Sequence, residues 1–118
     1  MAACRILVAD DDDALRETLT ELLRFEGYEV EAARDGLQAI LSATRTRPSV
    51  LLLDMRMPIL DGWQVARQLG AFGVDVPIVV MSAHVDAEAA AHDIEADSWL
   101  AKPFAFDELL PAIERLCA

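Results

Sequence analysis

In the middle of the chain the sequence reads Leu51-Leu52-Leu53-Asp54-Met55-Arg56-Met57-Pro58-Ile59-Leu60-Asp61-Gly62. A run of leucines is typical of a strand that is buried on both faces, and this run stops at a carboxylate. A proline and an Asp-Gly pair then turn the chain away from the sheet. Asp54 therefore stands where a strand gives way to a loop, and in parallel α/β sheets ligands bind at that edge.

Strand-like and helix-like segments alternate on both sides of this stretch. Short apolar runs predict strands at residues 5–9, 28–32, 50–53, 78–81 and 99–101, and a helical pattern follows each of them. This alternation predicts an α/β protein with a parallel sheet covered on both faces. The segment 86–96 has few large apolar residues, so we expect a loosely held helix there. Pro111 lies inside the last helical pattern and predicts a kink or a late start.

Composition limits the functions that the chain can have. Its 118 residues fit one domain, and an apolar fraction of 54% supports a substantial core. A net charge of -11 opposes binding to nucleic acid, because phosphate contacts need clusters of lysine and arginine. Without a secretory leader or an apolar run near the roughly 20 residues of a membrane span, we expect a cytoplasmic chain that does not engage membranes. In that compartment Cys4 and Cys117 are expected to be reduced thiols.

Polar side chains follow four of the predicted strands. They are Asp10, Asp11 and Asp12 after the first, Asp54 after the third, Ser82 after the fourth and Lys102 after the fifth. Parallel strands bring these groups to one edge of the sheet. Crowded carboxylates stay ionised together only beside a cation, and an oxygen cage that keeps waters suits Mg²⁺. With a lysine and a hydroxyl nearby, the set predicts phosphoryl transfer to Asp54.

Four segments then carry a resemblance to a known family. They are Ile6-Leu7-Val8-Ala9-Asp10-Asp11, Leu53 to Gly62, Met81-Ser82-Ala83 and Lys102-Pro103-Phe104. In this order and at these separations they resemble the response-regulator receiver domain of two-component signalling, in the CheY-like superfamily. The resemblance implies a flavodoxin-like (βα)5 fold, a doubly wound parallel sheet with strand order 2-1-3-4-5. It covers residues 1–118 as a single receiver, or phosphoacceptor, domain.

The resemblance also implies a function in phosphorelay signal transduction. Asp54 would accept a phosphoryl group from a sensor histidine kinase or a histidine phosphotransfer protein, in a Mg²⁺-dependent reaction. The surface made by the fourth helix, the fifth strand and the fifth helix would then change and signal to a partner protein. Such a phosphoprotein is not an enzyme, since it catalyses only its own phosphorylation and dephosphorylation. It would be a monomer or a phosphorylation-dependent dimer.

Individual residues match the family's metal and phosphoryl sites. Asp11 and Asp54 resemble direct Mg²⁺ ligands, together with the backbone carbonyl of Arg56. Asp10 resembles the ligand that acts through a water. Lys102 resembles the cation that pairs with the phosphoryl group.

Further residues match the family's switch and tuning positions. Ser82 resembles the hydroxyl switch residue, and Trp99 stands at the aromatic switch position, where tyrosine or phenylalanine is usual. Arg56 and His84 stand at positions that tune phosphoryl lifetime, and we hypothesise that Arg56 shields the acyl phosphate from water. Glu95 departs from the pattern, because a glycine is common there.

Other functions use similar groups, the same fold or a longer chain. A small Mg²⁺-dependent aspartyl-phosphate phosphatase of the haloacid-dehalogenase type uses similar groups, but the chain lacks that family's Gly-Thr after the second aspartate and a segment for a substrate cap. A flavin carrier shares the fold, but the first loop here is acidic. The chain also fits a receiver fragment of a longer regulator with a separate output domain.

Overall fold

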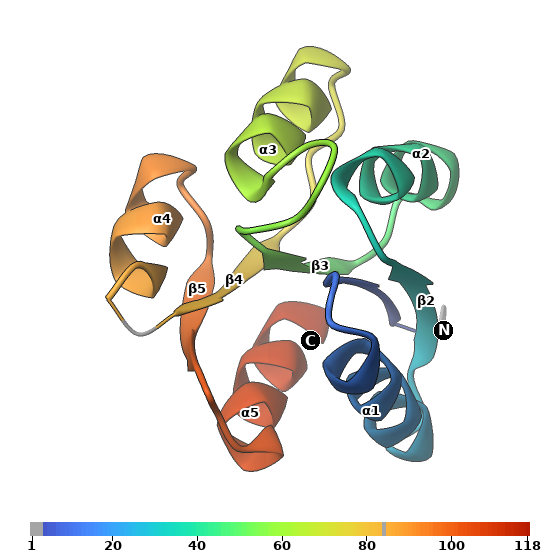
Figure 1. Ribbon diagram of the computed structural model, residues 1–118. Helices are drawn as coiled ribbons and strands as arrows, with labels where there is room; N and C mark the ends of the chain where they lie inside the picture. The colour runs from blue at the N-terminus through green and yellow to red at the C-terminus, as the bar shows by residue number, and fades with distance from the viewer. Residues whose placement is uncertain (1–3, 84) are drawn as a thin grey trace.

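The computed structural model describes residues 4–83 and 85–118, and within them five strands alternate with five helices. In chain order these are β1 (Arg5–Ala9), α1 (Asp13–Phe25), β2 (Glu29–Ala33), α2 (Gly36–Thr46), β3 (Val50–Asp54), α3 (Gly62–Ala71), β4 (Ile78–Ala83), α4 (Ala87–Asp93), β5 (Ser98–Lys102) and α5 (Phe106–Cys117). All strand pairs are parallel, and the strands lie in the order β2-β1-β3-β4-β5 (Figure 1). The expected flavodoxin-like topology is confirmed.

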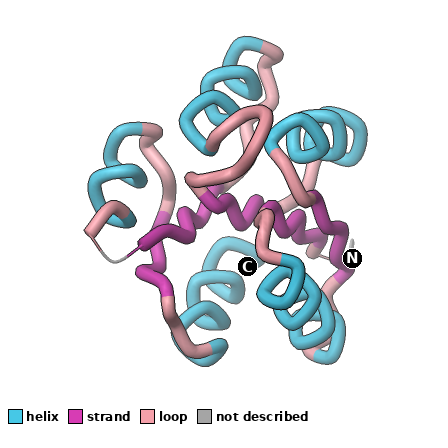
Figure 2. Tube along the Cα trace, in the orientation of Figure 1, coloured by secondary structure: helices cyan, strands magenta, loops and turns pink. Residues whose placement is uncertain are grey.

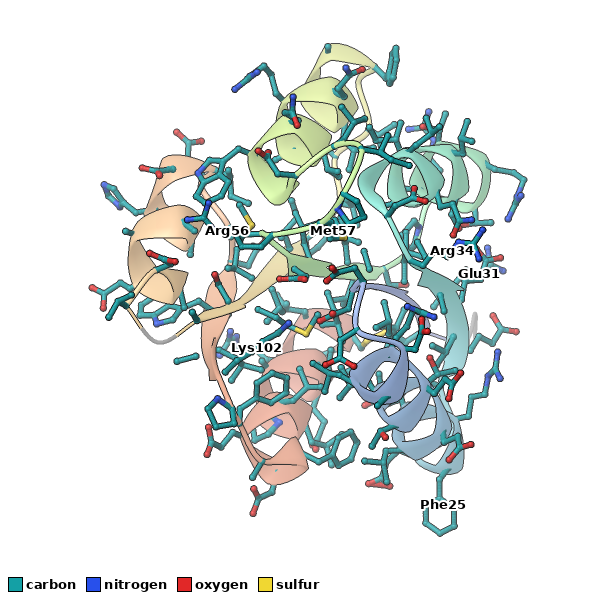
Figure 3. All side chains as sticks on the ribbon, viewed as in Figure 1. Phe25, Glu31, Arg34, Arg56, Met57 and Lys102 are labelled. Atoms are coloured by element: carbon teal, nitrogen blue, oxygen red, sulfur yellow. A yellow bond between two sulfur atoms is a disulfide. The ribbon has the colours of Figure 1, made fainter. Side chains whose placement is uncertain are left out.

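The sheet is the middle of three layers, with helices on both faces. In Figure 2, α2, α3 and α4 lie on one side of the sheet, and α1 and α5 lie on the other. Leu51 and Leu53 of β3 belong to the core under α2, α3 and α4, whereas Leu52 belongs to the core under α1 and α5. All three are fully buried, and side chains crowd both spaces (Figure 3). Burial on alternate faces explains why the central strand is apolar at successive positions.

Aspartates fix the starting points of the first helices. The carboxylates of Asp12, Asp35 and Asp61 each accept a backbone N–H from the first turn of α1, α2 and α3, at 3.2, 2.8 and 2.9 Å. Such caps satisfy amides that have no partner within the helix. Asp86 stands at the same position before α4, but its side chain accepts no N–H of that helix within the described part of the chain.

The Asp-Gly pair after β3 serves a close approach of the backbone to itself. The N–H of Gly62 donates to the carbonyl of Met55 at 3.0 Å, and a Cβ at position 62 would lie 2.8 Å from the Met55 Cα. Only glycine fits such a contact without a shift of the backbone. The loop that begins at Asp54 is therefore folded back against the end of β3.

Two helices differ from the sequence-based expectation. The final helix does not begin late, because α5 starts at Phe106 and continues past Pro111. The fourth helix is seven residues long, shorter than the expected 86–96, and its buried residues are all alanines. Glu95, beyond its end, adopts a left-handed conformation with φ 56, which favours glycine. No helix in residues 4–83 and 85–118 is long and apolar enough to cross a membrane.

The expectation of two reduced thiols is wrong in this structure, which joins Cys4 and Cys117 in a disulfide. Their Cα atoms lie 5.7 Å apart although 113 residues separate them in sequence. Cys4 precedes β1 and Cys117 ends α5, and both pack against the core under α1 and α5. The fold brings the two residues together, and no local sequence signal reveals this proximity.

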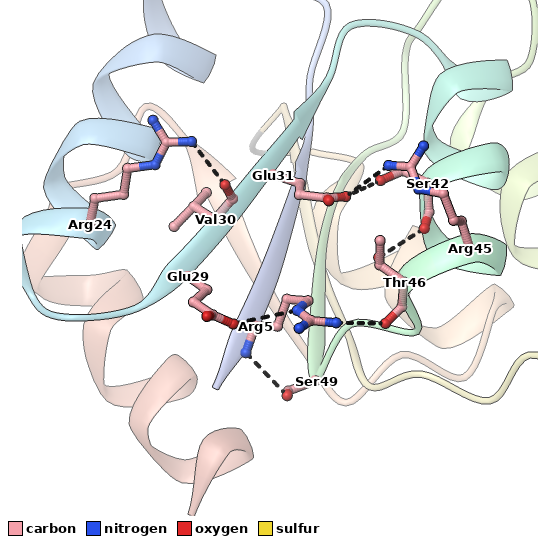
Figure 4. A network of polar contacts seen from close by, with 9 residues as sticks. All are labelled: Arg5, Arg24, Glu29, Val30, Glu31, Ser42, Arg45, Thr46 and Ser49. Carbon is pink, nitrogen blue, oxygen red and sulfur yellow. Dashed lines mark hydrogen bonds and ion pairs between the residues drawn. The ribbon is translucent and has the colours of Figure 1, made fainter. Parts of the chain in front are cut away.

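The edge strand β2 is covered by basic side chains of the neighbouring helices (Figure 4). Arg24 of α1 donates to the carbonyl of Val30 at 2.9 Å. On the other side, Glu31 accepts a hydrogen bond from Ser42 of α2 and pairs with Arg45 at 3.6 Å. The Arg24 contact occupies a backbone carbonyl of β2 that could otherwise pair with a foreign strand, and the Glu31 contacts tie β2 to α2.

Candidate functional site

Three carboxylates meet at the carboxyl end of the sheet. One oxygen from each of Asp10, Asp11 and Asp54 lies within 4.8 Å of the others. The register of β1 and β3 causes this, because Ala9 pairs with Leu53 and the next residue of each chain segment is an aspartate. Asp10 and Asp54 are buried, with exposures of 0% and 4%, whereas Asp11 is exposed to solvent.

Asp10 is held firmly in this cluster. Its Oδ1 accepts the backbone N–H of Asp12 at 2.9 Å, and its Oδ2 accepts Lys102 Nζ at 2.7 Å. Its backbone carbonyl accepts the guanidinium of Arg16 at 2.8 Å. A buried carboxylate with hydrogen bonds to both oxygens has a fixed orientation. The negative charge of Asp10 is therefore held in a fixed position beside Asp54.

Lys102 at the end of β5 is the cation of the cluster. Its Nζ lies between Asp10 Oδ2 at 2.7 Å and Asp54 Oδ1 at 3.5 Å. Burial alone would lower the pKa of Lys102, but the hydrogen bond with Asp10 and the charges of both aspartates raise it above its ordinary value. The ammonium therefore stays charged at neutral pH. The Lys102–Pro103 peptide bond that follows is cis.

The Asp54 carboxyl is poised to titrate near neutrality. Burial first, and then the Asp10 charge and a hydrogen bond with Asp11, raise its pKa to about 7, although Lys102 and the N–H of Arg56 act in the opposite direction. That N–H lies 3.3 Å from Asp54 Oδ1. The acids therefore carry more negative charge than the lysine balances. Converging carboxylate oxygens with excess negative charge fit a hard divalent cation such as Mg²⁺.

The cluster opens into a pocket of about 720 Å³. Its apolar lining includes Phe104, and its polar lining consists of Asp11, Asp12, Asp54, Arg56 and Lys102. An anionic group that enters this pocket meets the Asp54 carboxyl group, a lysine and an arginine. The pocket is thus suited to a small phosphorylated group bound with a metal ion.

Ser82 and Trp99 lie at different places relative to this pocket. Ser82 on β4 is 1% exposed, and its Oγ has no hydrogen-bond partner among the described residues. A buried hydroxyl without a partner is costly, so it is available to bond a group that arrives at the site. Trp99 on β5 is 46% exposed and lines a separate groove between α4 and β5. His84 lies outside the described residues.

Arg56 extends from the acid cluster toward α4, and Figure 3 labels it between α3 and α4. Its guanidinium carbon lies 5.2 Å from the centroid of the Trp63 ring, and its Nη2 lies 3.5 Å from Asp86 Oδ2. The indole N–H of Trp63 in turn donates to Asp93 at 3.1 Å. Sequence reasoning missed Asp86 and Asp93, because contacts across thirty positions leave no local pattern. The role of the Arg56 carbonyl as a metal ligand stays a prediction.

Comparison with known proteins agrees with this geometry. The family described as response regulator receiver domain matches residues 6–114. The response regulator MprA of Mycobacterium leprae (strain TN) is 49% identical over 114 residues, which cover 95% of this chain and 50% of that protein. The chain thus spans about half the length of the curated relatives that it matches.

Solved receiver structures share the fold. One is the receiver domain of a Pseudomonas aeruginosa PAO1 sensor histidine kinase, with a magnesium ion coordinated in the active site cleft. It is 33% identical, with a TM-score of 0.87 and coverage of 98% of both chains. The Thermotoga maritima response regulator TrrA, in complex with Mg²⁺-BeF, is 33% identical with a TM-score of 0.85, and covers 96% of this chain and 98% of its own. The phosphatase alternative is not favoured by these relatives, and the chain belongs to the family of response regulator receiver domains.

Proposed function

We propose that Asp54 accepts a phosphoryl group from a phosphohistidine on a sensor histidine kinase or a histidine phosphotransfer protein. The observation that carries the proposal is the position of its carboxylate, which is buried at 4% exposure yet lines the acid pocket beside Lys102. A reactive carboxylate needs access from one side and charge balance from the other, and this placement supplies both.

The same proposal includes a Mg²⁺ ion held by Asp10, Asp11, Asp54 and the Arg56 carbonyl. The convergence of the three carboxylates supports it, as does the presence of magnesium in the two solved structures described above. When bound, Mg²⁺ offsets the negative charge of the aspartates and of the incoming phosphoryl oxygens. A cation here also favours the ionised form of Asp54, which is the nucleophilic form.

In the proposed reaction a carboxylate oxygen of Asp54 attacks phosphorus, and the bond between phosphorus and the donor imidazole nitrogen breaks. The electron pair of that bond leaves with the imidazole. Lys102, whose ammonium already lies between Asp10 and Asp54, balances the charge of the transferred group. Hydrolysis of the acyl phosphate by water later restores the carboxylate. The chain thereby catalyses only its own phosphorylation and dephosphorylation.

Phosphorylation then changes the surface formed by α4, β5 and α5 in this proposal. Ser82 Oγ, for which the described residues offer no partner, donates to a phosphoryl oxygen and draws the end of β4 inward. The helix that follows, α4, buries only alanines and is the element that moves most easily. The groove beside Trp99 would change shape with it and so alter binding to a downstream protein. Trp99 thus serves as the aromatic switch, and Arg56 and His84 tune phosphoryl lifetime.

Intact mass spectrometry after incubation with acetyl phosphate and Mg²⁺ tests the proposal. We expect one phosphoryl adduct on the wild type and none on Asp54→Asn or in the presence of a chelator. Asp35→Asn is the matched control, because it removes another buried carboxylate while an asparagine can still cap α2. The proposal would be refuted by a phosphoryl adduct on Asp54→Asn. It would also be refuted if the wild type gave no adduct with acetyl phosphate and none with a phosphohistidine donor.

A further inference from the structure

We propose that Arg56 is a shared cation that locks α4 in the unphosphorylated protein. Trp63 and Asp86 hold its side chain, and a phosphoryl group on Asp54 draws it away and so releases the start of α4. The inference rests on the proposed function of Asp54 and adds a second trigger to it, separate from Ser82 and Trp99. Its evidence is a chain of contacts that joins the acid cluster to both ends of one helix.

The first part of that chain is the position of Arg56 itself. Its backbone N–H donates to Asp54 Oδ1 at 3.3 Å, and Arg56 is among the residues that line the pocket beside the acid cluster. Its side chain reaches Asp86 Oδ2 at 3.5 Å and is 68% exposed. Arg56 is therefore anchored by its backbone beside Asp54, while its exposed guanidinium lies next to Asp86, before the start of α4.

Trp63 completes the link between α3 and α4. Its ring packs under the Arg56 guanidinium, with 5.2 Å from the guanidinium carbon to the ring centroid. Its indole N–H donates to Asp93, the last residue of α4, at 3.1 Å. Arg56 in the loop after β3 thus contacts Asp86, before the first turn of α4, and Trp63 of α3 contacts Asp93, in its last.

The side chain of Asp86 gives separate evidence that its contact with Arg56 is present in one conformation of α4 and absent in another. It occupies the N-cap position of α4, yet its carboxylate bonds no N–H of the helix in the described structure and pairs with Arg56 instead. Asp12, Asp35 and Asp61 all cap their helices. The backbone of Asp86 is helical, with φ -108 and ψ -21, whereas the three capping aspartates are extended. When Arg56 leaves, a change of the Asp86 backbone to the extended form would let its carboxylate accept an N–H of the first turn, and α4 would settle in a new position.

The charges determine which way Arg56 moves. A phosphoryl group brings about 1.5 to 2 negative charges and three acceptor oxygens to Asp54. A guanidinium binds such a group through paired hydrogen bonds, whereas an exposed pair like that with Asp86 is weak. Lys102, the other cation that lines the pocket within residues 4–83 and 85–118, is already bonded to Asp10 at 2.7 Å. The guanidinium therefore has a better partner once Asp54 is phosphorylated.

A titration with beryllofluoride and Mg²⁺, a phosphoryl mimic, tests this in a Trp99→Phe parent whose remaining tryptophan is Trp63. We expect the Trp63 emission to change on binding. Asp86→Asn removes the competing carboxylate and should strengthen beryllofluoride binding by about threefold, the size typical of an exposed ion pair. Combined with Arg56→Met, the same substitution should have no effect on the affinity.

Glu88→Gln is the matched control, because it removes a charge of the same sign from the first turn of α4. Its effect on affinity should be small and equal with Arg56 or methionine at position 56. An Asp86→Asn effect that persists in the Arg56→Met background would overturn the inference, as would beryllofluoride affinities that are equal in all variants. A parent that binds no beryllofluoride would instead overturn the proposed function itself.

Discussion

Replacement of Asp54 by asparagine is expected to stabilise the metal-free protein, and the gain should grow with pH. The pKa of Asp54 is raised from 3.8 to about 7, chiefly by burial and by the Asp10 charge. Between these two values the folded state binds a proton that the unfolded state has released, so the stability of the wild type falls as pH rises through this window. The asparagine variant has no such proton, and its carbonyl can still accept the Arg56 N–H.

The gain in unfolding free energy follows from the difference between the two pKa values of Asp54, in the unfolded and the folded state. A difference of roughly three pKa units corresponds to about 4 kcal/mol of unfolding free energy at pH 8, and to less than about 1 kcal/mol at pH 4. Urea unfolding of both proteins in EDTA, at several pH values between 4 and 8, measures this difference directly.

Asp75→Asn serves as the control, because it removes an exposed carboxylate distant in sequence from the cluster. Its effect on the free energy of unfolding should stay within about 0.5 kcal/mol of zero at every pH. A difference between Asp54→Asn and the wild type that does not vary with pH would refute the reasoning. So would an asparagine variant less stable than the wild type at pH 8.

Three further results are expected. Mg²⁺ affinity, measured by calorimetry, should rise about tenfold per pH unit below pH 7 and level off above it, since the metal displaces the proton of Asp54; a flat profile contradicts this. Gly62→Ala should cost about 2 kcal/mol in urea unfolding, because its Cβ would meet Met55, whereas Gly70→Ala, with nothing within 4 Å, should not destabilise. Reductant should lower the free energy of unfolding of the wild type by about 4 kcal/mol through loss of the Cys4–Cys117 disulfide. If reductant lowered the stability of Cys117→Ser by the same amount, the disulfide would not be the cause.

The alternation of strands and helices and the meeting of the acids were accessible from sequence because their signals are local, whereas the strand order was implied by the resemblance to receiver domains. The leucines of β3 mark a strand buried on both faces, and Asp54 marks the point where it ends. Once strands are parallel, topology alone brings Asp10 and Asp54 to one edge. Glu95 is a similar case, since its departure from a common glycine corresponds to a left-handed residue in the structure.

The features that sequence could not supply are contacts between distant side chains. Arg56 reaches Asp86 across thirty positions, and Cys4 meets Cys117 across 113. Such pairs depend on the packing of α3, α4 and α5, which hydrophobic periodicity does not specify. The late start expected of α5 was wrong for a related reason, because packing of α5 against the sheet offsets the local cost of a proline within a helix, and the expected kink stays a prediction.

The proximity of Cys4 and Cys117 also makes this fold suitable for insertion into another protein. Entry and exit points whose Cα atoms are 5.7 Å apart match the spacing of near neighbours along an ordinary polypeptide, so the fold can be spliced into a surface loop of a host protein without stretching it. Because α5 belongs to the surface proposed to respond to phosphorylation, one junction with the host would lie at the end of a helix that is proposed to respond. If α5 responds to phosphorylation of Asp54 as proposed, an enzyme or fluorescent protein that carries this insertion is expected to respond to that phosphorylation through the junction at α5.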